Sequence, residues 1–188
     1  MMRIYTRGGD GGKTTVVGGG RRFKHDLRIE AYGSVDEAGA FIGLAGSQLS
    51  EERDRDILEV LALVEQRLWD VGADLATVHT EGVTYRTPEE AAQSLEPWID
   101  RYQSEAKSLS QFIVRGGHSG AAALHVACTV VRRAERRTVA LMERESIHPP
   151  ALRYLNRLSD LLFVLARAVN ARDGVKEVPY QNGGTVFR

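Results

Sequence analysis

Several features that would assign a protein class at once are scarce or absent in this sequence. The single cysteine, Cys128, excludes an intrachain disulfide and is typical of a chain kept in a reducing compartment. The 25 basic and 25 acidic side chains cancel, which argues against a uniformly basic nucleic-acid binder. No apolar run approaches the length of a bilayer span, and the N-terminus lacks the apolar core of a secretory signal. We therefore expect a soluble, cytoplasmic protein with neither nucleic acid nor membrane as a partner.

The sequence is instead rich in amphipathic helical patterns. Ser34 and Glu37 have the spacing of a capping box, and Pro88 with two following glutamates is typical of a first helical turn. Short strands are indicated only at residues 3–6 and 14–17. The helical segments are expected at residues 34–49, 51–76, 88–108, 118–145 and 151–173. Because helices joined by short connections pack most simply as antiparallel neighbours, we predict an all-α fold, a five-helix up-and-down bundle.

The predicted organisation is a single domain over residues 1–188. The bundle would extend from about 34 to 173, with a polar linker at 77–88. A glycine-rich segment over residues 1–25 precedes it, and a tail over 174–188 follows it.

The glycine-rich segment YTRGGDGGKTTVVGGG resembles the end of a Walker A loop but fails that motif in two ways. Arg7 occupies the position of the first glycine, and no strand and helix flank the segment. Glycine N–H groups and threonine hydroxyls can still bind an anion, Lys13 and Lys24 can neutralise phosphate, and Asp10 can hold magnesium. The alternative from composition alone is a flexible N-terminal tail.

The run VVRRAERR offers a second candidate site within the fourth helical segment. Arg132 and Arg136 are four residues apart, so they share a helix face and could clamp a polyphosphate, with Glu135 beside them. His125 and Cys128 lie upstream on the same stripe. The alternative is a solvated charged face or an ion network between subunits.

Polar residues interrupt the very apolar last segment, YLNRLSDLLFVLAR. Leu155, Leu158, Leu162 and Leu165 form its expected core stripe. Asn156 and Asp160 lie on another face and should meet something polar across the bundle, either a ligand or a buried structural network.

Two further candidates have simple structural explanations when taken alone. Asp36 and Glu37 are explained by helix capping, and Phe112, just before the double glycine of FIVRGG, is explained by core packing.

Together and in this order, YTRGGDGGKTT, EAYGSVDEAGAFIG, FIVRGG, RRAERR and YLNRLSDLLFVLAR resemble the PduO-type ATP:cob(I)alamin adenosyltransferases over nearly the whole chain. The resemblance implies a homotrimer with active sites between subunits. It also implies transfer of the 5′-deoxyadenosyl group of ATP to the cobalt of cob(I)alamin, which yields adenosylcobalamin and triphosphate. ATP, Mg²⁺ and cobalamin are then the expected ligands, and the expected partners are a reductase and an enzyme that receives the product.

The resemblance also assigns site residues. Phe112, Arg132 and Asp36 are implied to be catalytic, with Phe112 against the lower face of the corrin. The residues implied to bind cobalamin are Phe112, Asp36 and Cys128. The expected ATP-binding residues are Thr6, Arg7, Gly8, Gly9, Asp10, Lys13, Thr14, Thr15, Lys24, Arg132, Glu135, Arg136 and Asn156. We expect ATP to order the N-terminal segment.

Two positions depart from the family pattern. Cys128 stands where the family usually has an arginine that pairs with the aspartate of the VDE motif, here Asp36. Arg115 stands where the family commonly has proline, and we hypothesise that it partly replaces the missing charge. Because of Cys128, a carrier or sensor that binds ATP and corrinoid with reduced catalysis is the alternative function, and a purely structural helical oligomer is a second one.

Overall fold

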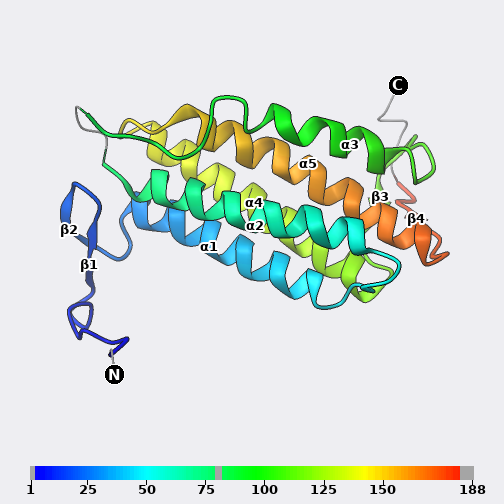
Figure 1. The fold of residues 1–188 in the computed structure, drawn as a ribbon, viewed down its shortest axis with the longest axis horizontal. Coiled ribbons are helices and arrows are strands. Elements are labelled where there is room, and N and C mark those ends of the chain that lie inside the picture. The colour runs from blue at the N-terminus through cyan, green and yellow to red at the C-terminus, as the bar shows by residue number, and fades with distance from the viewer. Residues whose placement is uncertain (1–2, 79–81, 183–188) are drawn as a thin grey trace.

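The computed structural model describes residues 3–78 and 82–182, which form an elongated bundle of five α-helices (Figure 1). Successive helices run in opposite directions, so the prediction of an up-and-down bundle is confirmed. The helices are α1 (Leu27–Gly46), α2 (Arg55–Ala76), α3 (Glu96–Gln103), α4 (Ser119–Met142) and α5 (Pro149–Arg172), with a short 3-10 turn η1 (Gln93–Leu95) before α3.

Helix α4 lies at the centre of the bundle, between α1 and α5, while α2 packs on α1 and α3 on α5. The core stripe expected from Leu155 to Leu165 is fully buried on α5, and the stripe from Ile57 to Val71 is buried on α2. Burial of each such side chain contributes about 1.5–3 kcal/mol relative to exposure, so apolar periodicity largely specifies this fold.

The predicted start of the first helix is wrong. Helix α1 begins at Leu27, because the Asp26 side chain accepts a hydrogen bond from the Arg28 amide (2.9 Å) and caps it. Ser34 lies inside the helix, where its hydroxyl donates to the Glu30 carbonyl (2.8 Å). The apolar pattern did not reveal the extra two turns because Arg28, a charged residue, occupies a fully buried position there.

The predicted helix over residues 88–108 is also wrong in extent. Pro88 does not begin a helix, and α3 covers only eight residues from Glu96 to Gln103. Pro97, which has no N–H to donate, lies in the first turn of α3 and limits how far the helix can extend backwards. Helix α2 likewise begins at Arg55 rather than at residue 51, after the buried carboxylate of Asp54.

Two small antiparallel sheets lie at opposite ends of the bundle (Figure 1). At one end β1 (Lys13–Val16) pairs with β2 (Gly20–Phe23), which confirms the strand expected at 14–17, whereas residues 3–6 form no strand. At the other end β3 (Ile113–Val114) pairs with β4 (Val178–Pro179), so residues 174–182 return to the bundle. No helix in the described ranges is long and apolar enough to cross a membrane.

An ion network joins α2, α5 and the end of α3. Arg172 donates two hydrogen bonds to the Asp56 carboxylate (2.8 and 2.9 Å) and two to Glu105 (2.7 and 2.9 Å). Tyr102, whose pKa burial raises to about 12, adds a hydrogen bond from its hydroxyl to Asp56 (3.1 Å). The hydrogen bonds from Arg172 lower the pKa of Asp56 to about 2.

We expect Arg172→Gln to lower the free energy of unfolding by about 1–2 kcal/mol at neutral pH, since charge-assisted bonds are lost but Asp56 is partly screened by solvent. The pKa of Asp56 is lower in the folded than in the unfolded protein, so its contribution is complete above about pH 4 and is lost as the pH falls toward 2. Urea unfolding at several pH values should therefore show a weaker acid dependence in the variant. Arg55→Gln, which breaks the exposed pair with Glu59, is the control and should change neither quantity.

Candidate functional site

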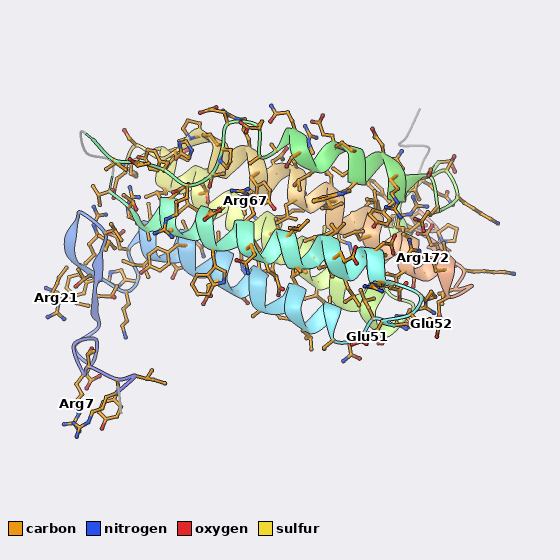
Figure 2. The ribbon with its side chains drawn as sticks, viewed as in Figure 1. Arg7, Arg21, Glu51, Glu52, Arg67 and Arg172 are labelled. Carbon is orange, nitrogen blue, oxygen red and sulfur yellow. The ribbon has the colours of Figure 1, made fainter. Side chains whose placement is uncertain are left out.

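The N-terminal segment projects from one end of the bundle (Figure 2). Its loop turns twice, with hydrogen bonds from the Asp10 amide to the Arg7 carbonyl (3.3 Å) and from the Gly12 amide to the Gly9 carbonyl (3.1 Å). Arg7 has φ of 58°, in the left-handed region that non-glycine residues rarely adopt. Backbone strain of this kind is concentrated at ligand-binding loops.

The predicted nucleotide-loop residues lie together in this segment. The Lys24 ammonium lies against Gly9, where an added Cβ would be 3.1 Å from Nζ, and the Lys24 amide donates to the Gly12 carbonyl (2.9 Å). Lys13 Nζ lies over the Phe23 ring, 4.5 Å from its centroid. Thr14 and Thr15 follow on β1, and the Thr6 hydroxyl accepts a hydrogen bond from the Gly8 amide (3.4 Å). The loop therefore gathers two ammonium groups, several glycine N–H groups and hydroxyls.

A buried arginine that the sequence pattern did not indicate shares a carboxylate partner with this segment. Arg28 is fully buried and donates to the carbonyls of Leu75 and Thr77 (both 2.7 Å) and to Glu145 (3.0 Å). Arg22, on β2, donates to the same Glu145 carboxylate (3.1 Å). The hydrogen bond from Arg22 lowers the pKa of Glu145, so the carboxylate is charged and ties β2 to the end of α4.

The four arginines of RRAERR divide into two pairs. Arg133 and Arg137 form ion pairs with Glu37 and Glu30 of α1, so the structural explanation of charged residues applies to this pair. Arg132 and Arg136 lie on the other face, where Arg132 Nε donates to the Ser159 hydroxyl (3.3 Å) and Arg136 donates to the Arg132 carbonyl (3.1 Å).

Arg132 and Arg136 are therefore two adjacent cations without a carboxylate partner among residues 3–78 and 82–182. Two guanidinium groups one helical turn apart, uncompensated by acids, favour the binding of an anion with several oxygens.

Glu135 and Asn156 meet across the interface between α4 and α5. The Asn156 amide donates to the Glu135 carboxylate (2.9 Å), as expected for a polar residue on such an apolar helix. Both side chains line a hollow of about 350 Å³ that is also lined by Gln93 of η1 and Glu96 of α3. Asp160, in contrast, forms an ion pair along its own helix, with Arg157 (3.5 Å).

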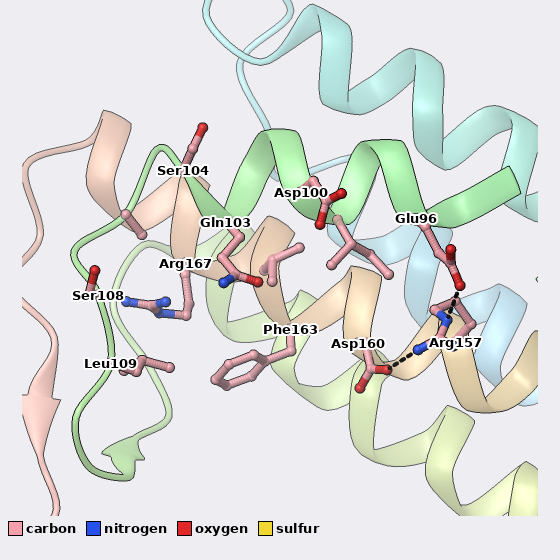
Figure 3. A pocket seen from close by; sticks show the side chains of 13 residues that line it. Glu96, Asp100, Gln103, Ser104, Ser108, Leu109, Arg157, Asp160, Phe163 and Arg167 are labelled. Carbon is pink, nitrogen blue, oxygen red and sulfur yellow. Dashed lines mark hydrogen bonds and ion pairs between the residues drawn. The ribbon is translucent and has the colours of Figure 1, made fainter. Parts of the chain in front are cut away.

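A larger hollow of about 960 Å³ lies between α3 and α5 (Figure 3). Phe163 and Arg167 of α5 face it, and Arg157 bridges Glu96 (3.3 Å) and Asp160 at its other end. A second hollow of about 500 Å³ shares Arg167 and Leu109 with it and reaches Ile113, the neighbour of Phe112. The side chain of Phe112 is 53% exposed. Gln111 and Ile113, the chain neighbours of Phe112, line this second hollow, and the two hollows together are large enough for a sizeable organic ligand.

Cys128 and Asp36 do not meet. The Cys128 thiol is buried between α4 and α5, donates to the Ser159 carbonyl (3.2 Å), and has a pKa raised by burial. Asp36 is exposed on α1. Arg115 lies near the buried stripe of α4, since its charge adds to the effect of burial in lowering the pKa of His125 to about 4.

One copy of the chain does not bring all the candidate residues together. The loop of residues 6–15 and the strand beside Phe112 lie at opposite ends of the bundle (Figure 1), and α4 between them has 24 residues, about 36 Å. Within the described residues, hydrogen bonds and ion pairs link the loop only to residues up to 24. Arg132, Glu135, Arg136 and Asn156 do form one group, on α4 and α5.

The residues fit a magnesium ion that arrives with a phosphate ligand better than one held by protein alone. In the part of the chain that the structure describes, no three His, Cys, Asp or Glu side chains form a metal-binding group. Magnesium is commonly bound through one or two carboxylates together with substrate phosphates, and the exposed Asp10 in the loop could supply one.

Comparisons with known proteins identify the family of the chain. A family model for cobalamin adenosyltransferase matches residues 4–169. The corrinoid adenosyltransferase of Bacillus subtilis (strain 168) is 49% identical over 188 residues, covering 100% of this chain and 96% of the relative. The corrinoid adenosyltransferase of Citrobacter freundii is 41% identical, over 89% of this chain and 94% of the relative.

Solved structures show the same fold. A phenylalanine-to-histidine variant of the PduO-type ATP:corrinoid adenosyltransferase from Lactobacillus reuteri, complexed with cobalamin and ATP, superposes with a TM-score of 0.94 at 37% identity, covering 98% of this chain and 100% of that one. An arginine-to-lysine variant complexed with ATP gives a TM-score of 0.88 at 36% identity, covering 95% and 100%. By sequence and by structure, the chain belongs to the cobalamin adenosyltransferase family, and within it to the PduO type.

Proposed function

We propose that this protein transfers the 5′-deoxyadenosyl group of ATP to the cobalt of cob(I)alamin, giving adenosylcobalamin and triphosphate. The observation that carries the proposal is the cationic face of Arg132 and Arg136, which has no carboxylate partner among the described residues and lies beside the Glu135–Asn156 pair, in a chain of this family. The phenylalanine-to-histidine neighbour from Lactobacillus reuteri, which is complexed with cobalamin and ATP, supports both ligands.

The chemistry requires little from the protein beyond positioning and charge. The cobalt supplies both electrons of the new bond to C5′, while the bond from C5′ to oxygen breaks and its electron pair leaves with triphosphate. Cob(I)alamin is a strong nucleophile, so no catalytic base is needed. Arg132, Arg136, Lys24 and the loop amides would stabilise the negative leaving group, with magnesium neutralising part of its charge.

The nucleotide site would be completed between subunits. The loop of residues 6–15 extends away from its own bundle, so the Arg132 face of a neighbouring copy is the natural partner for it (Figure 2). We infer a closed homo-oligomer, and the resemblance to PduO-type enzymes favours a homotrimer. On this basis we expect ATP to increase the amide-exchange protection of residues 6–15.

The corrin would occupy the hollow between α3 and α5, lined by Phe163 and Arg167, and the adjoining hollow that reaches the chain neighbours of Phe112. There Phe112 would exclude the lower axial ligand of cob(II)alamin, which eases the uptake of one electron from a reductase. The product would pass to an enzyme that uses adenosylcobalamin. Asp36, exposed on α1, would contact cobalamin from its own helix. Cys128 is buried, so it would affect cobalamin binding only through its hydrogen bond to Ser159 of α5.

One experiment tests the function and its rivals. ATP, magnesium and cob(II)alamin are supplied under reducing conditions, and the corrin absorption spectrum is followed. Formation of adenosylcobalamin supports the enzyme. A shift to axial-ligand-free Co(II) without product would instead identify a carrier or sensor, and an unchanged spectrum would leave only a structural oligomer.

We propose that Arg115 partly supplies the positive charge that the family has at position 128, where this chain has cysteine. Because its guanidinium acts on His125 and Cys128, it lies near the position where the family has arginine. We expect Arg115→Ala to weaken cobalamin binding severalfold, measured by titrating the corrin spectrum with ATP present. Equal affinity of the variant and the parent would exclude this role.

A further inference from the structure

Asn170, near the end of α5, holds the double glycine that follows the Phe112 strand. Its side chain is only 3% exposed, and its amide donates to the Gly116 carbonyl (2.9 Å). Its carbonyl oxygen accepts a hydrogen bond from the His118 amide (2.9 Å), at the N-terminus of α4. One buried carboxamide therefore satisfies backbone groups on both sides of Gly117.

Gly117 and Asn170 fit each other closely. Gly117 has φ of 105°, a conformation that side chains disfavour, and an added Cβ would lie 2.2 Å from the Asn170 side-chain oxygen. A side chain at position 117 would thus displace the carboxamide. The second glycine of FIVRGG, Gly117, is explained by this contact, whereas Gly116 is explained by its positive φ of 152°.

Helix α5 also holds β4, the strand that pairs with β3 directly after Phe112. The Val175 amide donates to the Asn170 carbonyl (2.9 Å), and the chain then continues into β4. Arg167, one turn before Asn170 and 3% exposed, donates two hydrogen bonds to Glu177 (2.7 and 2.8 Å). β4 pairs with β3, and the Tyr180 amide donates to the Phe112 carbonyl (2.8 Å).

Helix α5 thus controls the Phe112 backbone from two directions, through the carboxamide after it and through β4 beside it. We propose that Asn170 is a positioning residue that fixes the direction of Phe112 and, through it, the apolar wall against which cob(II)alamin loses its axial ligand. This inference rests on the proposed function. Asn170 itself lies 14 residues from Asn156 along α5, about 21 Å away, so it is remote from the nucleotide face.

The test compares Asn170→Asp with the parent protein. Aspartate keeps the acceptor for the His118 amide but has no N–H for the Gly116 carbonyl, and two oxygens then face each other. With saturating ATP, the fraction of cob(II)alamin in the axial-ligand-free form is measured from the absorption and EPR spectra. We expect this fraction to fall about tenfold, as positional errors of about 1 Å cost at least that much, while KM for ATP stays within about twofold.

Two further variants separate positioning from general stability. Gly117→Ala disturbs the same contact from the other partner and should reproduce the spectral loss, including when Asn170→Asp fails to fold. Val169→Ala truncates the neighbouring core residue and leaves both hydrogen bonds intact, so it should lower the melting temperature without changing the spectrum.

The outcomes test the positioning role of Asn170 separately from the proposed adenosyl transfer on which it rests. A parent protein that forms no adenosylcobalamin overturns the proposed function. An active parent together with an unchanged Co(II) spectrum in Asn170→Asp or Gly117→Ala overturns the positioning role. A spectral loss in Val169→Ala equal to theirs overturns it as well, because it would then reflect stability alone.

Discussion

Arg132→Ala is expected to lower kcat/KM for ATP by about 100- to 1,000-fold, the usual cost of removing one preorganised group that stabilises developing charge. The Ser159 hydroxyl, which accepts from Arg132 Nε, holds the guanidinium in place, and no acid in the described chain neutralises it. Steady-state kinetics with chemically reduced cob(I)alamin measures the effect, since reduction is then not rate-limiting. Arg132→Lys keeps a point charge but loses the planar fork, so an intermediate loss is expected.

Arg133→Ala is the matched control for this prediction. It removes the same charge from the adjacent residue, but Arg133 is ion-paired with Glu37 on the opposite face. We expect kcat/KM to change less than about threefold, and stability by under about 1 kcal/mol, as for exposed ion pairs. Equal losses in both variants would mean that the net charge of α4 matters and that the Arg132 face is not a specific site.

The two arginine pairs show which part of the candidate site could be predicted from the sequence. The four-residue spacing of Arg132 and Arg136 predicted a shared face, and the structure confirms that they lie together. The spacing alone could not tell that pair from Arg133 and Arg137, because both have the same period. Only the positions of Glu30 and Glu37 on α1, a long-range feature, show which pair is neutralised.

For the fold as well, local sequence pattern predicts the elements but not their long-range contacts. Apolar periodicity predicted five helices because it reports burial along one element, and the stripe of α5 is buried as expected. It failed where tertiary contacts override local pattern, as at Arg28, which is buried because three backbone carbonyls and Glu145 accept hydrogen bonds from its N–H groups. β4 carries no pattern of its own, since two residues cannot show a period, and its pairing depends on Arg167 and Glu177.

The position of Phe112 depends on both local sequence and long-range contacts. The double glycine after it was visible in the sequence, but Asn170 and β4, which hold its backbone, were not. Phe112 can therefore be tested as a wall whose value depends on being both apolar and correctly placed. Substitution of Phe112 by alanine, leucine or histidine changes the size or the polarity of the side chain and leaves the backbone contacts intact.

Phe112→Ala is expected to lower turnover by about 100-fold when cob(II)alamin is the substrate and a reductant is supplied, which corresponds to a barrier raised by about 3 kcal/mol. Without the ring, an axial ligand could stay on the cobalt, and the electron would enter a less accessible orbital. With cob(I)alamin prepared chemically, the reduction step is bypassed, so the loss should shrink to within about tenfold. The ratio of these two rates separates an effect on reduction from an effect on adenosyl transfer.

Phe112→Leu and Phe112→His complete the series. Leucine remains apolar and fills much of the space, so it should retain most of the axial-ligand-free Co(II) signal, whereas histidine offers an imidazole nitrogen to the cobalt and should abolish it. If leucine were as damaging as alanine, the aromatic ring itself would be required, by stacking rather than by exclusion. If alanine slowed both substrates equally, Phe112 would act in binding the corrin and not in preparing cobalt for reduction.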